Sequence, residues 1–577
     1  MTGADVLVKL LEEYGVEVIF GVPGDTNVAF YKALNRSGKV RHVMARDERS
    51  ALYMADAYAR YSGKPGVAEC PSGAGAMYSL PGMAEANSSS IPLILLTNDI
   101  PLKGEGRGMI TELDNAKLFE PVCKLSFQVK TTAKIPEAVR RAFRTATSGR
   151  PGAVHLTFPE DILAHASAST PDEIYAEPEC RRFPAFPMRP DADLVRQLAA
   201  LLDASRRPVL VAGGGVMHSD GGAALLALAE KIDAAVVTTI TGQGAVPDEH
   251  PLALGVIGDN GFHPHAARAV EESDLLVYLG CKMGSVVTIG WTFPSHQQER
   301  QRVQVDIDPA VLGNTGRNDL NIAGDVRSVL QDLLPLVTEH EPRAWNAELN
   351  GMRRRFWEQA QADLHSDALP LKPQRVVHEL NRRLPPRAVM VSDAGTPTPH
   401  MTRYLRLPGD GSRLVIPRAF GGLGYAIPAV VGAWLARPDV RPIGLFGDGS
   451  FSMSCGELET LTRLQVPAVL LHFNNGCFGW IKALQKLHND AQYLSVDFTR
   501  LDVARIAQGF GLKGLRAANA EELVAALDEA FASEGPVLID IVSESIVDEC
   551  PPVYSWIKAM GKDPLAVGGA WQAHCPG

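Results

Sequence analysis

Short, mostly apolar runs recur along this 577-residue chain, with helical patterns between them. Residues 91–96 and 153–158 are two examples, and both runs are too short for typical helices. Strands of a parallel sheet produce such runs because helices cover both faces of the sheet. The alternation therefore predicts an α/β protein built from doubly wound parallel sheets.

The chain is too long for one hydrophobic core, since domains usually hold ~100–200 residues. Two stretches separate three α/β blocks: the first is rich in Pro, Ala, Ser and Glu, and the second is polar with a helical pattern. We expect an N-terminal domain over residues 1–165, a linker over 166–190, a central domain over 191–338, a second linker over 339–372, a C-terminal domain over 373–545 and a tail over 546–577.

The composition, with 46% hydrophobic and 21% charged residues, is that of an ordinary globular protein. The net charge of −10 argues against a nucleic-acid partner, and we interpret the run Arg353, Arg354 and Arg355 as a solvated helix face. The eight cysteines form no CxxC pair, which indicates neither a zinc site nor a disulfide framework. Because the sequence shows no signal-peptide pattern and no apolar run of ~18 residues, we expect a cytoplasmic protein that does not enter a membrane.

The third block contains the clearest chemical motif. The apolar run 443–446 leads directly into Gly447-Asp448-Gly449-Ser450, and a helical pattern follows. The next apolar run, 468–473, leads into Asn474-Asn475, with 24 residues between the GDG and the NN. If the two strands are parallel neighbours, both loops lie at one edge of the sheet, where α/β proteins bind ligands.

These residue types suit a diphosphate held through Mg²⁺, which prefers oxygen ligands. Asp448 offers a carboxylate, Asn475 a side-chain carbonyl and Cys477 a main-chain oxygen. The two glycines of the GDG let the backbone approach phosphate, and Ser450 begins a helix whose N–H groups favour anions. Either loop alone fits an ordinary turn, but together, at this spacing, they indicate a cofactor site.

The GDG and NN motifs at this spacing resemble those of thiamine-diphosphate-dependent enzymes. The likeness to the acetolactate synthase-like group, which includes benzoylformate decarboxylase, extends over residues 1–545. It implies three consecutive doubly wound domains: a pyrimidine-binding, a central and a diphosphate-binding domain. It also implies thiamine diphosphate and Mg²⁺ as cofactors, with Asp448, Asn475 and the main chain of Cys477 as metal ligands.

Other segments resemble the cofactor-binding loops of this group. Residues 393–396 look like its second diphosphate loop, which places Thr396 at the cofactor, and Phe478 joins it from the segment after the NN. In a glycine-rich segment, the Gly421 carbonyl would accept a hydrogen bond from the 4′-amino group, and Leu423 would support the bent cofactor. Without the resemblance, that segment also fits a turn before a helix.

The N-terminal block supplies an acid. Activation of this cofactor needs a Glu in a largely apolar site, where its proton affinity is raised. By resemblance Glu48 is this catalytic residue, and Pro23, Gly24 and Ser72 contact the cofactor. Taken alone, Asp47 and Glu48 fit acids at a helix N-terminus; beside the motif of the third block, we assign that role to Asp47 only.

The resemblance implies a carboligase or lyase that forms or cleaves the C–C bond next to a carbonyl of a 2-oxo acid, through a C2 ylide and an enamine. An aldehyde or a second oxo acid would be the acceptor. The alternatives are a simple 2-oxo acid decarboxylase and, from another class, a flavin-dependent 2-oxo acid oxidase. Because Glu48 and Asp448 lie on different domains, the resemblance implies a homodimer or homotetramer with active sites between subunits.

The substrate residues differ from those of acetolactate synthases. Asp114 and the pair Ala483-Leu484 stand where those enzymes carry a Gln and a Trp-containing segment. Asp114 fits either a proton-handling acid or a solvated loop acid, and Trp480 fits either a substrate contact or a core residue. Asp25 and Asn27 lie where relatives place a pocket residue. We therefore hypothesise that condensing two pyruvates is not the main reaction, and that one partner is bulkier or more polar than pyruvate.

The central block carries weaker indications. Gly213-Gly214-Gly215 follows a strand but lacks the full dinucleotide-binding spacing. Residues 280–284 replace the flavin-binding stretch of acetolactate synthases, so FAD or another nucleotide, if it binds, is expected not to be catalytic. His263 and His265 have no acidic partner at ligand spacing and are predicted to lie in a surface turn. The C-terminal tail fits either a cover over the site or a surface appendage.

Overall fold

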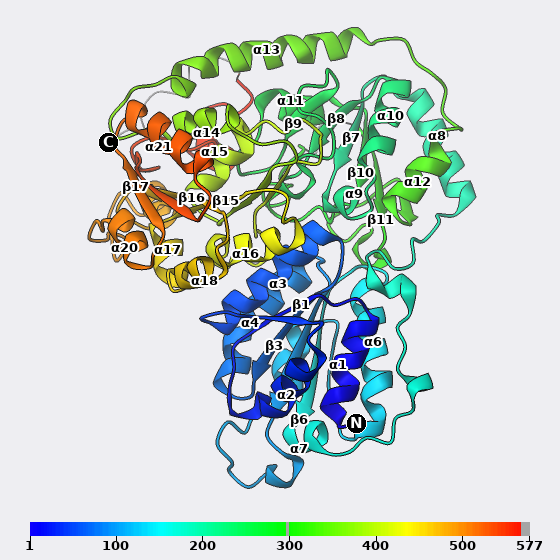
Figure 1. Ribbon diagram of the computed structural model, residues 1–577. Coiled ribbons are helices and arrows are strands. Elements are labelled where there is room, and N and C mark those ends of the chain that lie inside the picture. The colour runs from blue at the N-terminus through cyan, green and yellow to red at the C-terminus, as the bar shows by residue number, and fades with distance from the viewer. Residues whose placement is uncertain (296–298, 567–577) are drawn as a thin grey trace. The chain divides into compact units, whose positions relative to one another are not determined.

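The computed structural model describes residues 1–295 and 299–566 (Figure 1). It contains three six-stranded sheets that follow one another along the chain. Their strands pair in parallel. The prediction of three consecutive doubly wound parallel-sheet domains is confirmed. The strand orders are β2-β1-β3-β4-β6-β5, β12-β11-β10-β7-β8-β9 and β14-β13-β15-β16-β18-β17.

Contacts divide the chain into two compact units. The first comprises Met1–Phe186, Pro417–Gly444 and Ser450–Ala468. The second comprises Pro187–Ile416, Leu445–Gly449 and the chain from Val469 onward. The N-terminal sheet thus shares its unit with helices from late in the sequence, an association that no local pattern indicates.

The strands of the N-terminal sheet are β1 (Val18–Gly21), β2 (Arg41–Met44), β3 (Gly66–Pro71), β4 (Leu93–Asp99), β5 (Leu125–Gln128) and β6 (Ala153–Pro159). Its helices include α1 (Gly3–Glu13), α2 (Val28–Ser37), α3 (Glu48–Ser62), α4 (Ala74–Ser88), α5 (Asn115–Phe119) and α6 (Ile135–Thr147). The inner strands β4 and β6 are buried throughout, which explains their apolar sequences. The edge strands β2 and β5 are partly exposed, so no continuous apolar run marks them in the sequence.

Helix α16 (Ala426–Ala436) packs along α3 within the first unit (Figure 1). Gly432 permits this close approach, because a Cβ there would lie 1.9 Å from the Met54 carbonyl oxygen. Asp56 of α3 accepts hydrogen bonds from the Tyr425 hydroxyl at 2.5 Å and from Arg60 Nε at 2.7 Å. The hydrogen bond from Tyr425, the residue just before α16, therefore joins that helix to the buried Asp56–Arg60 pair within α3.

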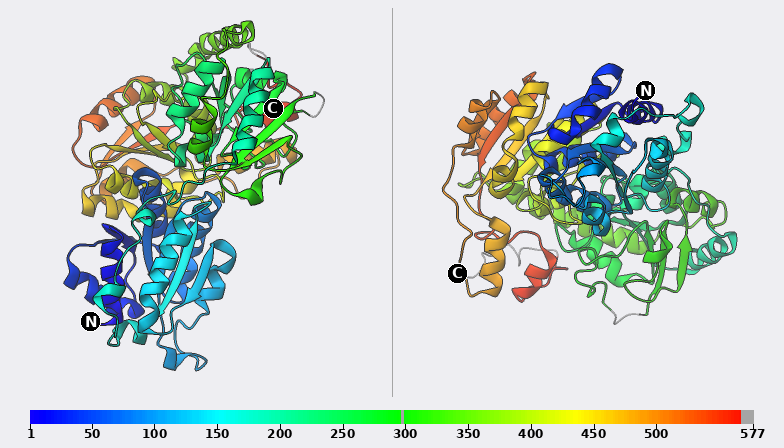
Figure 2. Two further views of the ribbon diagram at one scale, coloured as in Figure 1. Left: turned by 90° about the vertical axis from the view of Figure 1, so that its right-hand side faces the viewer. Right: turned by 90° about the horizontal axis from the view of Figure 1, so that it is seen from below.

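The strands of the central sheet are β7 (Pro208–Ala212), β8 (Ala235–Thr238), β9 (Ala253–Val256), β10 (Leu275–Leu279), β11 (Gln301–Asp306) and β12 (Leu320–Ala323). Two apolar clusters lie on its opposite faces. One contains side chains of α8 (Ala192–Ala204), α10 (Gly222–Ile232) and α12 (Val326–Leu333). The other contains those of α11 (Pro264–Glu272) and α13 (Ala344–Leu364), and the views of Figure 2 show these helices around the sheet.

The glycines after β7 have a packing role. A Cβ on Gly213 would lie 2.2 Å from the Gly280 carbonyl oxygen, and one on Gly215 would lie 2.6 Å from the Gly280 Cα. The loops after β7 and β10 therefore approach one another closely, which explains small residues there without a nucleotide.

The predicted surface turn at His263 and His265 is wrong. Both side chains are buried, with 6% and 1% of their surface exposed, and both rings lie 5.5 Å from the Phe356 ring of α13. Burial lowers the pKa of His263 to about 3, helped by the nearby charge of Arg403. The sequence misled here because the helix that covers these rings comes from about 90 residues farther along the chain.

The strands of the C-terminal sheet are β13 (Val389–Ser392), β14 (Arg413–Val415), β15 (Pro442–Gly447), β16 (Val469–Asn474), β17 (Lys513–Ala517) and β18 (Val537–Val542). Its helices are α14 (Pro373–Asn381), α15 (Pro397–Tyr404), α17 (Asp448–Ser454), α18 (Glu457–Leu464), α19 (Gly479–His488), α20 (Val503–Gly509) and α21 (Ala520–Ala532). The strand order makes β15 and β16 neighbours, as the GDG and NN motifs require.

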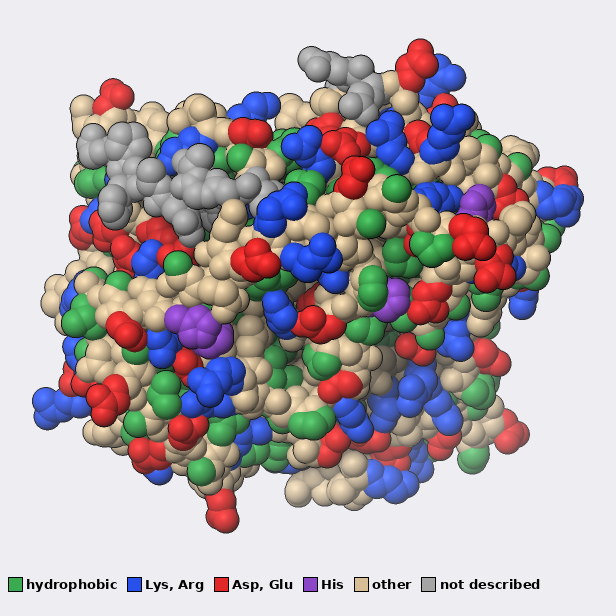
Figure 3. Space-filling view, turned by 90° about the horizontal axis from the view of Figure 1, so that it is seen from above, with side chains coloured by type: hydrophobic (Ala, Val, Ile, Leu, Met, Phe, Trp, Pro, Cys, Tyr) green, Lys and Arg blue, Asp and Glu red, His purple; other side chains and the backbone are tan. Residues whose placement is uncertain are grey.

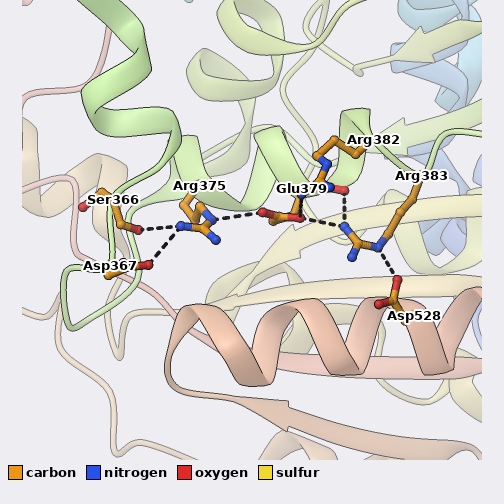
Figure 4. Close-up of polar contacts among 7 residues, drawn as sticks. All are labelled: Ser366, Asp367, Arg375, Glu379, Arg382, Arg383 and Asp528. Atoms are coloured by element: carbon orange, nitrogen blue, oxygen red, sulfur yellow. Dashed lines mark hydrogen bonds and ion pairs between the residues drawn. The ribbon is translucent and has the colours of Figure 1, made fainter.

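A cluster of charged side chains joins α14 to α21 (Figure 4). Glu379 is 1% exposed and accepts hydrogen bonds from Arg375 Nε at 3.2 Å and from Arg383 Nη1 at 2.7 Å. Arg383 also donates through Nε to Asp528 of α21 at 2.6 Å. Glu379 therefore orients the arginine that reaches the neighbouring helix.

The described part of the tail is not a surface appendage. Its helix α22 (Tyr554–Ala559) buries Trp556, whose ring centroid lies 4.5 Å from that of Trp480 in α19. Tyr554 N and Ser555 N donate hydrogen bonds to Asp259 of the central domain at 2.8 Å each. Residues 546–566 thus cover part of α19, while the rest of the tail lies outside the described residues.

Basic and acidic side chains are interspersed on the face shown in Figure 3. In the run of three arginines, Arg354 and Arg355 are exposed, whereas Arg353 donates to the His250 and Ala253 carbonyl oxygens at 2.7 Å. Within residues 1–295 and 299–566, the helices are all too short or too polar to cross a membrane.

Candidate active site

Asp448 lies where β15 passes directly into α17, and its carboxylate faces the loop after β16. Asp448 Oδ2 accepts hydrogen bonds from Asn475 N at 3.0 Å and from Gly476 N at 3.2 Å. The side chain is 12% exposed. The structure therefore brings the GDG and NN motifs together at the carboxyl edge of the C-terminal sheet.

The side-chain oxygen of Asn475 accepts hydrogen bonds from Cys477 N at 3.3 Å and from Cys477 Sγ at 3.4 Å, and it also lies close to two other oxygens. It is 3.1 Å from the Cys477 carbonyl oxygen and 3.2 Å from Asp448 Oδ2. Without a cation, the amide would turn over and donate hydrogen bonds to both atoms. Asp448, Asn475 and the Cys477 carbonyl would offer a cation three oxygen ligands, the type that Mg²⁺ prefers. These residues therefore fit the metal that the family implies.

Two residues that the sequence reasoning missed lie behind Asp448. His472 Nε2 is 3.6 Å from Asp448 Oδ1, and His472 Nδ1 is 2.9 Å from Asp540 Oδ1. Asp540 also accepts a hydrogen bond from Asn474 Nδ2 at 2.9 Å. His472 and Asp540 point inward from buried strands. A charged residue inside an apolar run is the signal that marks them.

The other predicted diphosphate residues of the second unit surround this loop. Thr396 Oγ1 accepts a hydrogen bond from Asn475 Nδ2 at 3.4 Å. A Cβ on Gly449 would lie 2.4 Å from the Phe478 ring, so the glycine makes room for that ring. A Cβ on Gly447 would be in ordinary van der Waals contact with the Phe473 carbonyl oxygen at 3.9 Å and with Thr396 Oγ1 at 4.0 Å.

Glu48 is the first residue of α3, and Asp47 caps the helix by accepting a hydrogen bond from Ser50 N at 3.2 Å. The Glu48 side chain is buried, with 8% of its surface exposed. Burial raises the pKa of Glu48, and the charges of Asp47 and Glu69 raise it further. Glu48 therefore has the protonation tendency that an acid at a cofactor requires.

Glycines allow close packing around Glu48. A Cβ on Gly75 would lie 2.8 Å from Glu48 Oε1 and 2.7 Å from Pro71 Cγ. A Cβ on Gly24, which follows the exposed Pro23, would lie 2.6 Å from Pro71 Cβ. The loops after β1 and β3 thus meet beside Glu48.

Ser72 is held by its neighbours. Its N–H donates to the Asn98 carbonyl oxygen at 2.9 Å and its hydroxyl to Asp99 Oδ1 at 2.9 Å. It is 2% exposed. Ser72 therefore stabilises the loop after β3 through these hydrogen bonds, and little of its side chain is accessible to a ligand.

The glycine-rich segment before α16 belongs to the first unit, as does Ser450. Gly421 is exposed and has a φ of 78°, a conformation that favours glycine. Phe420 N donates to Glu85 Oε2 at 2.9 Å, and a Cβ on Gly422 would lie 2.3 Å from the Tyr53 hydroxyl. Leu423 is half-buried.

The proposed substrate residues near β1 and α5 differ in exposure. Asp25 is exposed, whereas Asn27 is fully buried. Asp114 caps α5 by accepting a hydrogen bond from Lys117 N at 3.1 Å, and its carboxylate lies 2.8 Å from Lys117 Nζ. These contacts lower the pKa of Asp114. These contacts hold Asp114 at the start of α5 beside Lys117.

Helix α19 lines a cavity of about 230 Å³, roughly half as large again as the ~150 Å³ cavity that binds benzene in another protein. Ala483 contributes to its wall, and Trp480 and Leu484 pack in the adjoining apolar cluster. Among the described residues that line it, Lys486 is the one with a charged side chain. The other lining residues are Leu487, Ile546, Val547, Cys550, Pro551, Trp556, Ala559 and Met560.

Three segments of the chain match domains of thiamine pyrophosphate (diphosphate) enzymes. Residues 1–118 match the N-terminal TPP binding domain, residues 195–333 the central domain and residues 393–541 the C-terminal TPP binding domain.

Full-length relatives give the same result. The chain is 35% identical to a probable acetolactate synthase large subunit of Methanocaldococcus jannaschii, over 94% of this chain and 92% of the relative. It is 33% identical to an acetolactate synthase of Mycobacterium bovis, over 94% and 88%. It is 31% identical to the acetolactate synthase isozyme 1 large subunit of Escherichia coli, over 96% of each. The chain therefore belongs to the thiamine-diphosphate-dependent enzymes, within their acetolactate synthase-like group.

Proposed function

We propose that this protein is a thiamine-diphosphate- and Mg²⁺-dependent carboligase that joins a 2-oxo acid donor to a second carbonyl compound. The observation that carries the proposal is the position of the Asn475 side-chain oxygen. It lies 3.1 Å from the Cys477 carbonyl oxygen and 3.2 Å from Asp448 Oδ2. When bound, thiamine diphosphate supplies a nucleophilic carbon for the donor carbonyl.

The residues of the chain would divide the work in three ways. Asp448, Asn475 and the main chain of Cys477 would hold Mg²⁺, and Thr396 would lie beside the diphosphate. Glu48 Oε1, in its buried setting, would hold the proton that cofactor activation needs.

The proposal also covers the location of the protein, its oligomeric state, a nucleotide in the central domain and the domain bounds. The protein would act in the cytoplasm as a homodimer or homotetramer, with Glu48 of one subunit serving the Asp448 site of another. FAD or another nucleotide in the central domain would not be catalytic. The chain would divide into domains over residues 1–165, 191–338 and 373–545.

The reaction outcome separates this proposal from its alternatives. The relatives are named acetolactate synthases, which favours C–C bond formation over simple decarboxylation and over a flavin-dependent oxidation. Incubation of the purified protein with Mg²⁺, thiamine diphosphate and a panel of 2-oxo acids and aldehydes tests this. Coupled products support the carboligase, whereas aldehydes alone, or reduction of a bound flavin, contradict it.

We further propose that one reaction partner is bulkier or more polar than pyruvate. The cavity beside Ala483 supports this, because it has room for a ring or a branched chain and one cation, Lys486, in its wall. Steady-state kinetics on pyruvate alone should give weak acetolactate formation. A kcat/KM of ~10⁴ M⁻¹s⁻¹ or more, typical of enzymes on their own substrates, would contradict the proposal.

A further inference from the structure

The carboxylate of Glu69 is fully buried. Glu69 lies in β3, the strand that precedes the loop beside Glu48. Its Oε1 accepts a hydrogen bond from the Tyr31 hydroxyl at 2.7 Å and lies 3.2 Å from His42 Nε2. Its Oε2 accepts hydrogen bonds from Asn98 Nδ2 at 3.3 Å and from Asn27 Nδ2. The partners come from α2, β2, β4 and the loop after β1, so one side chain links four segments.

This position is built for a carboxylate. A Cβ on Gly21 would lie 2.0 Å from Glu69 Oε1, so only glycine leaves the necessary space in β1. Burial of a charge without a strong cation is costly, and an apolar side chain would fill a central strand at lower cost. Burial raises the pKa of Glu69, although its hydrogen bonds to His42, Tyr31 and Asn27 oppose the rise. Hydrophobic packing alone therefore does not explain a glutamate at this position.

The contact of Glu69 with Asn27 suggests a role for this carboxylate. Because its amide nitrogen faces Glu69, its Oδ1 must point away from Glu69. This oxygen is buried and accepts no hydrogen bond within the described residues. It lies 3.6 Å from the position that a Cβ on Gly24 would occupy, and Gly24 in turn contacts Pro71 beside Glu48. Glu69 thus sets both the orientation of the Asn27 amide and the path of the loop that carries Gly24.

We propose that Glu69 is a positioning residue of the cofactor site, which holds the Pro23-to-Asn27 loop in place through its hydrogen bond to the Asn27 amide. This inference rests on the proposed function, since Pro23 and Gly24 are proposed cofactor contacts. Asn98 also anchors this loop, because its carbonyl oxygen accepts hydrogen bonds from Thr26 Oγ1 at 2.6 Å and from Ser72 N at 2.9 Å.

The test compares Glu69→Gln with a rescue variant. Glutamine has the shape of glutamate but no charge, so the hydrogen bonds that Asn27 and Asn98 donate at Oε2 meet a neutral oxygen or an NH2 group, and the anchor of the loop is weakened. Cofactor affinity, measured by calorimetry with Mg²⁺ and thiamine diphosphate, should fall at least about tenfold, which is one step of 1.4 kcal/mol. Exchange of the cofactor C2 proton, followed by NMR, should also slow.

The rescue variant combines Glu69→Gln with Asn27→Asp. It restores an amide–carboxylate hydrogen bond with donor and acceptor exchanged, and a carboxylate oxygen still points toward Gly24. Affinity should return to within about threefold of wild type, because the loop regains its anchor. Tyr31→Phe is the matched control, since it removes a hydrogen bond from Glu69 without touching the loop. It should lower the melting temperature of the cofactor-free protein but leave cofactor affinity unchanged.

Three outcomes would overturn the inference. These are wild-type affinity in Glu69→Gln, a rescue variant that regains its melting temperature but not its affinity, and an affinity loss in Tyr31→Phe equal to that in Glu69→Gln. Should Glu69→Gln not fold, Asn27→Ala removes the same hydrogen bond from the loop side and must weaken binding similarly. Absence of cofactor binding by the wild-type protein is a different result, because it contradicts the proposed function itself.

Discussion

At the scale of single residues, Asp448 has the most direct role to test. Its Oδ2 lies 3.2 Å from the Asn475 amide oxygen, so two oxygen acceptors face one another at this position. We expect Asp448→Ala to abolish saturable, Mg²⁺-dependent binding of thiamine diphosphate in calorimetry. Asp497→Ala is the control, because this carboxylate is 61% exposed and pairs with Lys482. Equal binding by both variants would remove Asp448 from the metal site.

Substitution of Glu48 tests activation of the cofactor rather than binding of the cofactor. Glu48→Gln preserves size but cannot hold the proton, so the variant should still bind the cofactor. Exchange of the cofactor C2 proton should slow by ~10²–10⁴-fold, the usual contribution of general acid–base assistance. Asp47→Asn, which can still cap α3, should exchange at close to the wild-type rate. A wild-type exchange rate in Glu48→Gln, measured by quenched NMR, would exclude this role.

At the scale of elements, the Glu379 cluster fixes α14 beside α21 (Figure 4). Burial tends to raise the pKa of Glu379, but Arg383, Arg375 and Arg382 bring it below its ordinary value. The folded state then binds fewer protons than the unfolded state around the ordinary glutamate pKa. The carboxylate therefore stabilises the fold above that pKa, and this stabilisation is lost as the pH falls through the lowered pKa.

Glu379→Gln should consequently destabilise the protein by about 1–3 kcal/mol at neutral pH, since the half-buried guanidinium groups of Arg375 and Arg383 lose a charged acceptor. The difference from wild type should shrink as the pH falls through the lowered pKa of Glu379, because the wild-type carboxylate is then also protonated. Urea unfolding at several pH values measures this. Asp528→Asn is the control at the exposed end of the cluster and should destabilise the protein less than Glu379→Gln does. A difference that does not change with pH would contradict an electrostatic role.

At the scale of the whole molecule, the proposed sharing of active sites between subunits predicts complementation. Glu48→Gln and Asp448→Ala proteins should each be inactive. In a mixed dimer, one site would carry both substitutions, and the other would carry neither. Random exchange of subunits should therefore restore about one quarter of wild-type activity. Subunit exchange verified by differently tagged chains, but without recovered activity, would show that each site lies within one subunit.

Much of this protein could be read from local sequence. Buried parallel strands have continuous apolar runs, and helices follow them, so the fold class and the inner strands such as β6 and β15 were predictable. The GDG and NN motifs lie at strand ends, and neighbouring parallel strands necessarily place their ends together. The cap at Asp47 was also predictable, because helix capping depends on residues adjacent in the chain.

The tertiary structure decided what depends on residues far apart in the chain. The surroundings of Glu69, with donors from Asn27 to Asn98, leave no local pattern. The contact of α16 with α3, the support of Asp448 by His472 and Asp540, and the burial of His263 under α13 also join distant segments. Periodicity and motifs record which neighbours along the chain share a face, whereas long-range contacts depend on how whole elements pack. For that reason the sequence determined the fold class and the cofactor motif, and the packing alone decided which buried polar groups support the site.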